Sequence, residues 1–219
     1  MISPQERKER SERKIIKKGI GINKYLPMVP PSNAVKLRDI DDVCKRAIAA
    51  LLSTQVAFEI SNQNYKDVKF FIDLMYKFNV RDCLNPKEQN LVNAQFSAQD
   101  VTDVVWEYEC YWSLVWALGL VGDIEDASSV CDCNIAVRLV ADCEDFEEFK
   151  AKCRMRDIEE ILDMLDLYYR YHWATVQRKW IDKELPIGDL NEEIVYERRR
   201  GLEWLISDED NWFDISLDT

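Results

Sequence analysis

Residues 106–119 read WEYECYWSLVWALG, and this stretch decides the fold class of the chain. A turn of about 100° per residue gathers Glu109, Trp112 and Trp116 on one face of an α-helix, whereas Glu107 points the other way. The pattern predicts one buried helix that carries a carboxylate inside an aromatic stripe. A buried Glu109 must be paired, hydrogen-bonded or protonated, so it is the first candidate site residue.

The rest of the chain carries helical patterns too, and only the tail, residues 211–219, alternates apolar and polar residues. Glycine and proline number six each, which disfavours a turn-rich β-fold. No repeat of fixed period is evident, so a repeat solenoid is not supported. We predict an all-α fold, a single globular domain of about seven to nine helices. The expected helices cover residues 39–59, 65–78, 87–92, 97–119, 135–140, 146–152, 156–181 and 191–206.

The N-terminal segment differs in charge from the rest of the chain. Residues 1–24 contain eight Lys or Arg and three Glu, a net charge of 8 − 3 = +5, in a chain of net charge −12. Glycines and prolines follow, as is typical of a helix end and a stiff linker. We predict two parts: residues 1–31, a basic helix and linker packed on the acidic body, and residues 32–219, the helical domain. The alternative is a basic arm that binds an acidic polymer or a membrane.

Charge and hydropathy exclude some partners. A body with a net charge of −12 repels phosphate, so we expect no nucleic-acid partner. The longest apolar run, residues 111–121, is shorter than the ~20 residues of a membrane span, so we expect no membrane insertion. The composition fits a basic protein partner better, whereas a small anionic ligand would need a local clamp such as Arg198.

The seven cysteines indicate a reducing compartment. Most lie in helical patterns, and no signal peptide is visible, so we expect a cytoplasmic protein with free thiols. The spacing of Cys131, Cys133, Cys143 and Cys153 is not that of a structural zinc site, and no phosphate-binding or metalloprotease motif is present. We therefore assign neither a metal nor a cofactor.

Two more helices each place a polar residue in an apolar stripe. His172, the one histidine, lies in the stripe of residues 156–181, and Arg198 lies in that of residues 191–206, where Glu197, Arg199 and Arg200 point away. Glu109, His172 and Arg198 would neutralise one another if they met. Our hypothesis is that they form one partly buried site, lined by Trp112, Trp116, Tyr169 and Trp173.

That cluster has two interpretations. It can be a pocket in which Glu109 is a base, His172 a proton shuttle and Arg198 an anion clamp. It can equally be a structural ion-pair network that fixes the register of the helices. The sequence favours the structural interpretation, because no nucleophile motif accompanies the three residues.

Six segments of the chain carry a resemblance to a known family. They are GIGIN at 19–23, VKLR at 35–38, residues 106–119, YRYHWA at 169–174, VYER at 195–198 and DISLDT at 214–219. In these segments the chain resembles the domain of unknown function 4272 family of bacterial proteins. The resemblance spans almost the whole chain and departs at Leu217, where such a tail would have a polar residue. It implies an all-helical intracellular protein and implies no activity.

Three functions stay open from the sequence. The first is a binding or interaction domain with an aromatic-lined polar pocket, which the sequence favours. The second is an enzyme with a Glu109–His172 acid–base pair and an Arg198 anion clamp. The third is an acidic inhibitor of a basic protein, of the immunity type.

Overall fold

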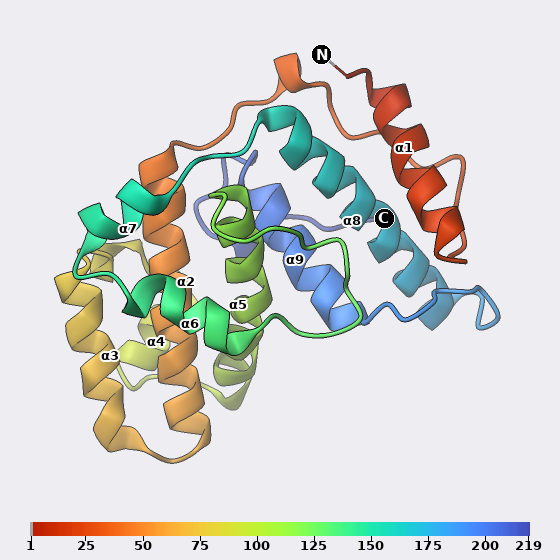
Figure 1. Ribbon diagram of the computed structural model, residues 1–219. Helices are drawn as coiled ribbons and strands as arrows, with labels where there is room; N and C mark the ends of the chain where they lie inside the picture. The colour runs from red at the N-terminus through yellow and green to blue at the C-terminus, as the bar shows by residue number, and fades with distance from the viewer. Residues whose placement is uncertain (1) are drawn as a thin grey trace. The chain divides into compact units, whose positions relative to one another are not determined.

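The computed structural model describes residues 2–219, and within them the chain is all-helical, as predicted (Figure 1). Nine α-helices and three short 3₁₀ helices are present in these residues, and no strand is. The 3₁₀ helices are Ser32–Ala34, Arg81–Cys83 and Trp212–Asp214, of which the last lies in the tail whose alternating pattern is typical of an extended segment. The α-helices are α1 (Pro4–Lys17), α2 (Ile40–Ser61), α3 (Tyr65–Lys77), α4 (Pro86–Val92), α5 (Ala98–Ala117), α6 (Cys133–Ala141), α7 (Phe146–Lys152), α8 (Ile158–Trp180) and α9 (Glu192–Trp204).

Side-chain caps explain where several helices begin. The Ser97 hydroxyl accepts a hydrogen bond from the backbone N–H of Asp100, whose carboxylate accepts one from the N–H of Ser97. Asn85 and Glu88 form the same reciprocal box at the start of α4. Each box satisfies backbone donors that the first helical turn leaves without a partner.

The chain divides into two compact units. Residues 2–38, 123–130 and 156–219 form the first unit, and residues 39–122 and 131–155 form the second. The division into residues 1–31 and 32–219 that we expected from composition stays a prediction, and Met1 lies outside the described residues. None of the helices in residues 2–219 combines the length and the apolar character that a membrane crossing requires.

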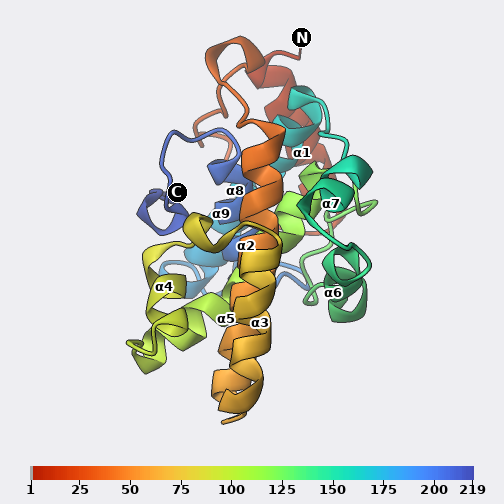
Figure 2. The ribbon, with the colours of Figure 1, turned by 90° about the vertical axis from the view of Figure 1, so that its left-hand side faces the viewer.

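In the second unit, α2 is the central helix. It packs against α5 and α3, with smaller contacts to α4 and α7. Two views show α3 alongside α2 (Figures 1 and 2). Residues are buried around the whole circumference of α2 and of the second half of α5, whereas α3 buries only Met75.

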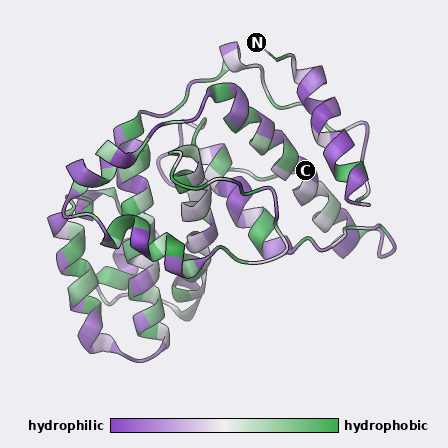
Figure 3. Ribbon diagram, viewed as in Figure 1, coloured by the Kyte–Doolittle hydropathy of each residue, from purple (hydrophilic) through white to green (hydrophobic). Residues whose placement is uncertain are grey.

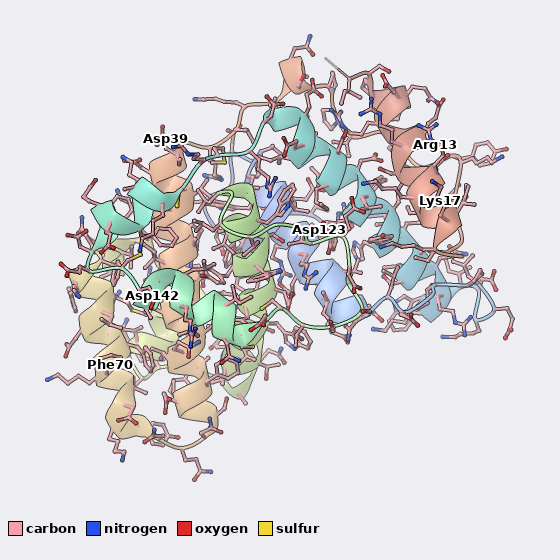
Figure 4. All side chains as sticks on the ribbon, in the orientation of Figure 1. Arg13, Lys17, Asp39, Phe70, Asp123 and Asp142 are labelled. Atoms are coloured by element: carbon pink, nitrogen blue, oxygen red, sulfur yellow. The ribbon has the colours of Figure 1, made fainter. Side chains whose placement is uncertain are left out.

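In the first unit, α8 packs against both α9 and α1 (Figure 1). The helix α1 is mostly hydrophilic (Figure 3), and Ile15 is its one fully buried apolar residue. Ion pairs attach α1 to α8 instead. The fully buried Arg7 donates to Asp163 of α8, with 2.9 Å between Nε and Oδ1, and forms an ion pair with Glu159. Arg13 and Lys17 project outward from α1 (Figure 4).

The second unit buries a group of charged side chains, one of which the sequence had placed on the opposite face of its helix. Glu107, predicted to point away from the buried face of α5, is fully buried. Its Oε1 accepts a hydrogen bond of 2.8 Å from the Asn85 side chain, and its carboxyl group shares a hydrogen bond with that of Glu88. Glu88 is also buried and forms an ion pair with Arg46. One arginine thus faces two carboxyl groups.

Burial and the neighbouring Glu88 charge raise the pKa of Glu107 well above 4.5. The folded protein therefore holds a proton there that the unfolded chain releases near pH 4.5. The contribution of Glu107 to the free energy of unfolding then falls as the pH rises from 4.5 through its folded-state pKa, by about 1.4 kcal/mol per pH unit in that window.

We predict that Glu107→Gln removes this loss of stability, because glutamine has the shape of the protonated acid and cannot ionise. Urea unfolding of both proteins between about pH 5 and pH 9 measures it. Glu147→Gln, at an exposed position of α7, is the matched control and should leave the pH profile unchanged. A wild-type profile that is parallel to that of Glu107→Gln would contradict a protonated Glu107.

Candidate functional site

The helices α8 and α9 carry four of the predicted site residues: Tyr169, His172 and Trp173 on α8, and Arg198 on α9. The structure corrects one expectation about α9. Arg199 and Arg200, predicted to point away from its buried face, are both buried, and so is Glu197. The helix is covered on most of its circumference, so it has no polar face to which these side chains could turn.

Arg198 binds the backbone of an irregular segment. Its guanidinium donates to the carbonyl oxygens of Ile124, Asp126 and Ser129, and to the Tyr168 hydroxyl at 3.2 Å. The Tyr168 hydroxyl in turn donates to the Ile124 carbonyl. Within the first unit, the residue that we expected to clamp an anion therefore holds main-chain carbonyl groups.

Arg199, the next residue, binds a different segment. Its Nη1 donates to the Leu217 carbonyl at 2.9 Å, and its Nη2 donates to the Asp218 carbonyl at 3.2 Å. Glu203, one turn along α9, accepts from the same guanidinium at 3.3 Å. The Tyr169 ring lies 4.7 Å from the guanidinium carbon, a cation–π distance. Arg199 therefore joins α8, α9 and the tail.

His172 is the neighbour of Arg199. Its Nδ1 lies 2.6 Å from Nη1 of Arg199, and its ring packs edge-on against Tyr196. Burial, with the charges of Arg199 and Arg200, lowers the pKa of His172 to about 4. Because arginine only donates, Nδ1 is the acceptor, and near neutral pH the imidazole is uncharged with its proton on Nε2.

The second unit holds the remaining predicted residues. Glu109, Trp112 and Trp116 of α5 are all buried, as the helical pattern predicted. Oε1 of Glu109 accepts a hydrogen bond of 2.8 Å from the backbone N–H of Cys131, so the buried carboxylate has one of the bonds that it requires.

Glu109, His172 and Arg198 thus each contact different groups. Within the first unit, His172 contacts Arg199 and Tyr196, whereas Arg198 holds the segment of residues 124–129. Glu109 belongs to the other unit. The meeting of all three at one site therefore stays a prediction. In the part of the chain that the structure describes, no three histidine, cysteine, aspartate or glutamate side chains are placed to hold one metal ion.

Arg199, the partner of His172, was not among the site residues predicted from the sequence. One signal was present, since three consecutive arginines cover about 200° of a helix. A helix buried on most sides must bury more than one of them. Two of the acceptors of Arg199, however, are carbonyl groups of the tail, which no helical pattern reveals.

Comparison with known proteins agrees with the resemblance seen in the sequence. Residues 7–215 match the model of the family described as "Domain of unknown function (DUF4272)", and the chain belongs to this family. No curated protein and no solved structure matches the chain.

We predict that the single histidine titrates with a pKa of about 4 in a proton NMR titration of the folded protein. Arg199→Met should raise this pKa toward 6.5, because it removes a positive charge and a donor from the ring. Arg198→Met is the matched control: it deletes a neighbouring guanidinium that holds other groups and should leave the titration in place.

The same titration tests the predicted cluster. If Glu109 shares a site with His172, Glu109→Gln shifts the histidine pKa, because a carboxylate at close range stabilises the imidazolium. An unchanged titration would contradict the cluster. A wild-type pKa near 6.5 would contradict the neutral, buried acceptor itself.

Proposed function

We propose that this family member is a binding domain whose ligand is an extended peptide segment, recognised at the Arg199 site through main-chain carbonyl oxygens. One observation carries the proposal: the buried Arg199 guanidinium donates to two successive carbonyl groups, those of Leu217 and Asp218, in a segment outside the helices. A guanidinium presents its donors in a fixed fork, which suits two adjacent carbonyl groups. In the chain by itself, the tail occupies this site.

The groups around Arg199 are better suited to binding a peptide than to catalysing a reaction. His172 is held uncharged as a hydrogen-bond acceptor and fixes the guanidinium, and the Tyr169 ring stabilises the positive charge. The side chain of Leu217 is buried beside the site, and Asp218 adds a favourable charge near Arg199. The preferred ligand is therefore an extended segment with an apolar residue followed by an acidic one.

A hollow in the second unit also supports a binding role. It measures about 210 Å³ and is lined mainly by apolar side chains of α2, α3 and α6. Phe70 of α3 lies on its edge with 60 % of its surface exposed (Figure 4). Exposed apolar groups beside a hollow are typical of a contact surface for another molecule.

The finer expectations from the sequence are part of the same proposal. We infer a cytoplasmic location from the seven thiols, and partners other than nucleic acid from the net charge of −12. A basic protein partner or a small anionic ligand is consistent with that composition. The enzyme alternative requires Glu109, His172 and Arg198 to meet, and the inhibitor alternative rests on charge alone.

We predict that a labelled peptide with the sequence of residues 211–219 binds the full chain weakly and a tail-loosened variant at least about tenfold more tightly. Competition from the chain's own tail lowers the apparent affinity by the fraction of molecules with an open site. Leu217→Gly is the loosening variant, because it removes the buried side chain of the tail. Fluorescence anisotropy measures both affinities.

Arg199→Met in the Leu217→Gly background should abolish binding, and a peptide of scrambled sequence should bind no variant. Arg13→Met, an exposed arginine of α1, controls for the loss of one positive charge. If NMR shows a mobile tail in Leu217→Gly and the peptide still fails to bind, the proposed function is wrong.

A further inference from the structure

The second unit contains two cysteines in direct contact that the proposed function does not use. Cys44 lies in the first half of α2, and Cys153 directly follows α7. Both are free thiols, and a hydrogen bond joins them. Cys44 is fully buried, whereas Cys153 retains 8 % of its surface. They are separated by 153 − 44 = 109 positions in the sequence, so the fold brings them together.

Other contacts hold the two segments in this register. Lys150 of α7 forms an ion pair of 2.6 Å with Asp41, in the first turn of α2. The Lys45 ammonium lies 5.8 Å from the centre of the Phe146 ring. The Cys153 thiol donates to the Phe149 carbonyl at 3.3 Å. Because the Cys153 proton is directed at the Phe149 carbonyl, the sulfur of Cys153 is the acceptor in its hydrogen bond with Cys44, and the Cys44 S–H is the donor.

The direction of that hydrogen bond distinguishes the two sulfur atoms. The Cys44 S–H stabilises a thiolate on Cys153, which lowers the pKa of Cys153, and the same bond together with burial raises the pKa of Cys44. Cys153 is also the thiol of the pair that keeps a surface open to solvent. Together these properties make Cys153 the attacking thiol and Cys44 the resolving one.

We propose that Cys44 and Cys153 form a reversible disulfide when the protein meets hydrogen peroxide. The Cys153 thiolate attacks the peroxide: an S–O bond forms, the O–O bond breaks, and one molecule of water leaves after protonation. Cys44 then attacks the sulfenic acid: the S–S bond forms, the S–O bond breaks, and a second water leaves. The two thiols together lose two electrons and two protons, and the peroxide is reduced. A dithiol reductant reverses the reaction by exchange.

The cross-link would join α2 to the end of α7 and enclose most of the second unit. A disulfide across so long a loop restricts the unfolded chain strongly. The oxidised protein is therefore expected to unfold at a temperature several degrees higher than the reduced protein.

The test uses the full chain, reduced and then treated with hydrogen peroxide. Remaining thiols are alkylated under native and then denaturing conditions, and the digest is analysed by mass spectrometry. We expect one linked pair of peptides containing Cys44 and Cys153, the loss of two of the seven alkylated thiols, and full recovery with a dithiol. Thermal unfolding of the oxidised sample measures the rise in Tm.

Two variants separate the steps. Cys44→Ser should accumulate sulfenic acid on Cys153, trapped by dimedone, whereas Cys153→Ser should give no adduct at Cys44. Cys110→Ser, another buried cysteine of the second unit, is the matched control and should leave the cross-link intact. Cross-linking of another pair, or oxidation only after denaturation, would overturn the proposal. Peptide binding at Arg199, in the first unit, is a separate readout, so either proposal can fail alone.

Discussion

Buried arginines that donate to backbone carbonyl groups are the interaction on which the irregular parts of this protein depend. A buried guanidinium cannot lose its proton, so its N–H groups must find acceptors. Here the acceptors lie largely in loops and in the tail. The buried arginines pair as follows: Arg46 with Cys83, Arg198 with residues 124–129, and Arg199 with residues 217–218. Two half-buried arginines do the same, Arg38 with Trp204 and Glu209, and Arg178 with Leu185. Each arginine stands on or next to a helix and binds carbonyl groups of a loop, of the tail or of the last residue of another helix.

This arrangement explains why a chain with few turn-forming residues can carry long irregular connections. Main-chain carbonyl groups buried outside helices require donors. In the first unit, two consecutive residues of α9 supply donors to two segments, one before α8 and one after α9. The tail is thereby part of the first unit, and Trp212, which packs edge-on against Trp204, adds an apolar anchor.

The helices could be predicted from the sequence, whereas only some of the buried charged residues could. The 3.6-residue period and the scarcity of glycine were sufficient for the all-α class and for most helix bounds. The helical periodicity also predicted the burial of Glu109 and His172. It failed for Glu107 and Arg199, because a helix covered on most sides has no polar face, and the pattern then no longer separates inside from outside. The partners that satisfy these groups lie in other segments, beyond the reach of any local pattern.

Ion pairs attach α1 to the rest of the first unit, so the stability of this attachment depends on ionic strength. Dissolved ions screen exposed charges over a Debye length of about 8 Å at physiological salt, and they screen a desolvated pair far less. Lys14, half-exposed in its pair with Glu125, is open to that screening, whereas Arg7 at the other end of α1 is sealed from solvent. Concentrated salt should therefore loosen the Lys17 end of α1 first and leave the Arg7 end attached, so that the helix detaches by degrees, starting from one end.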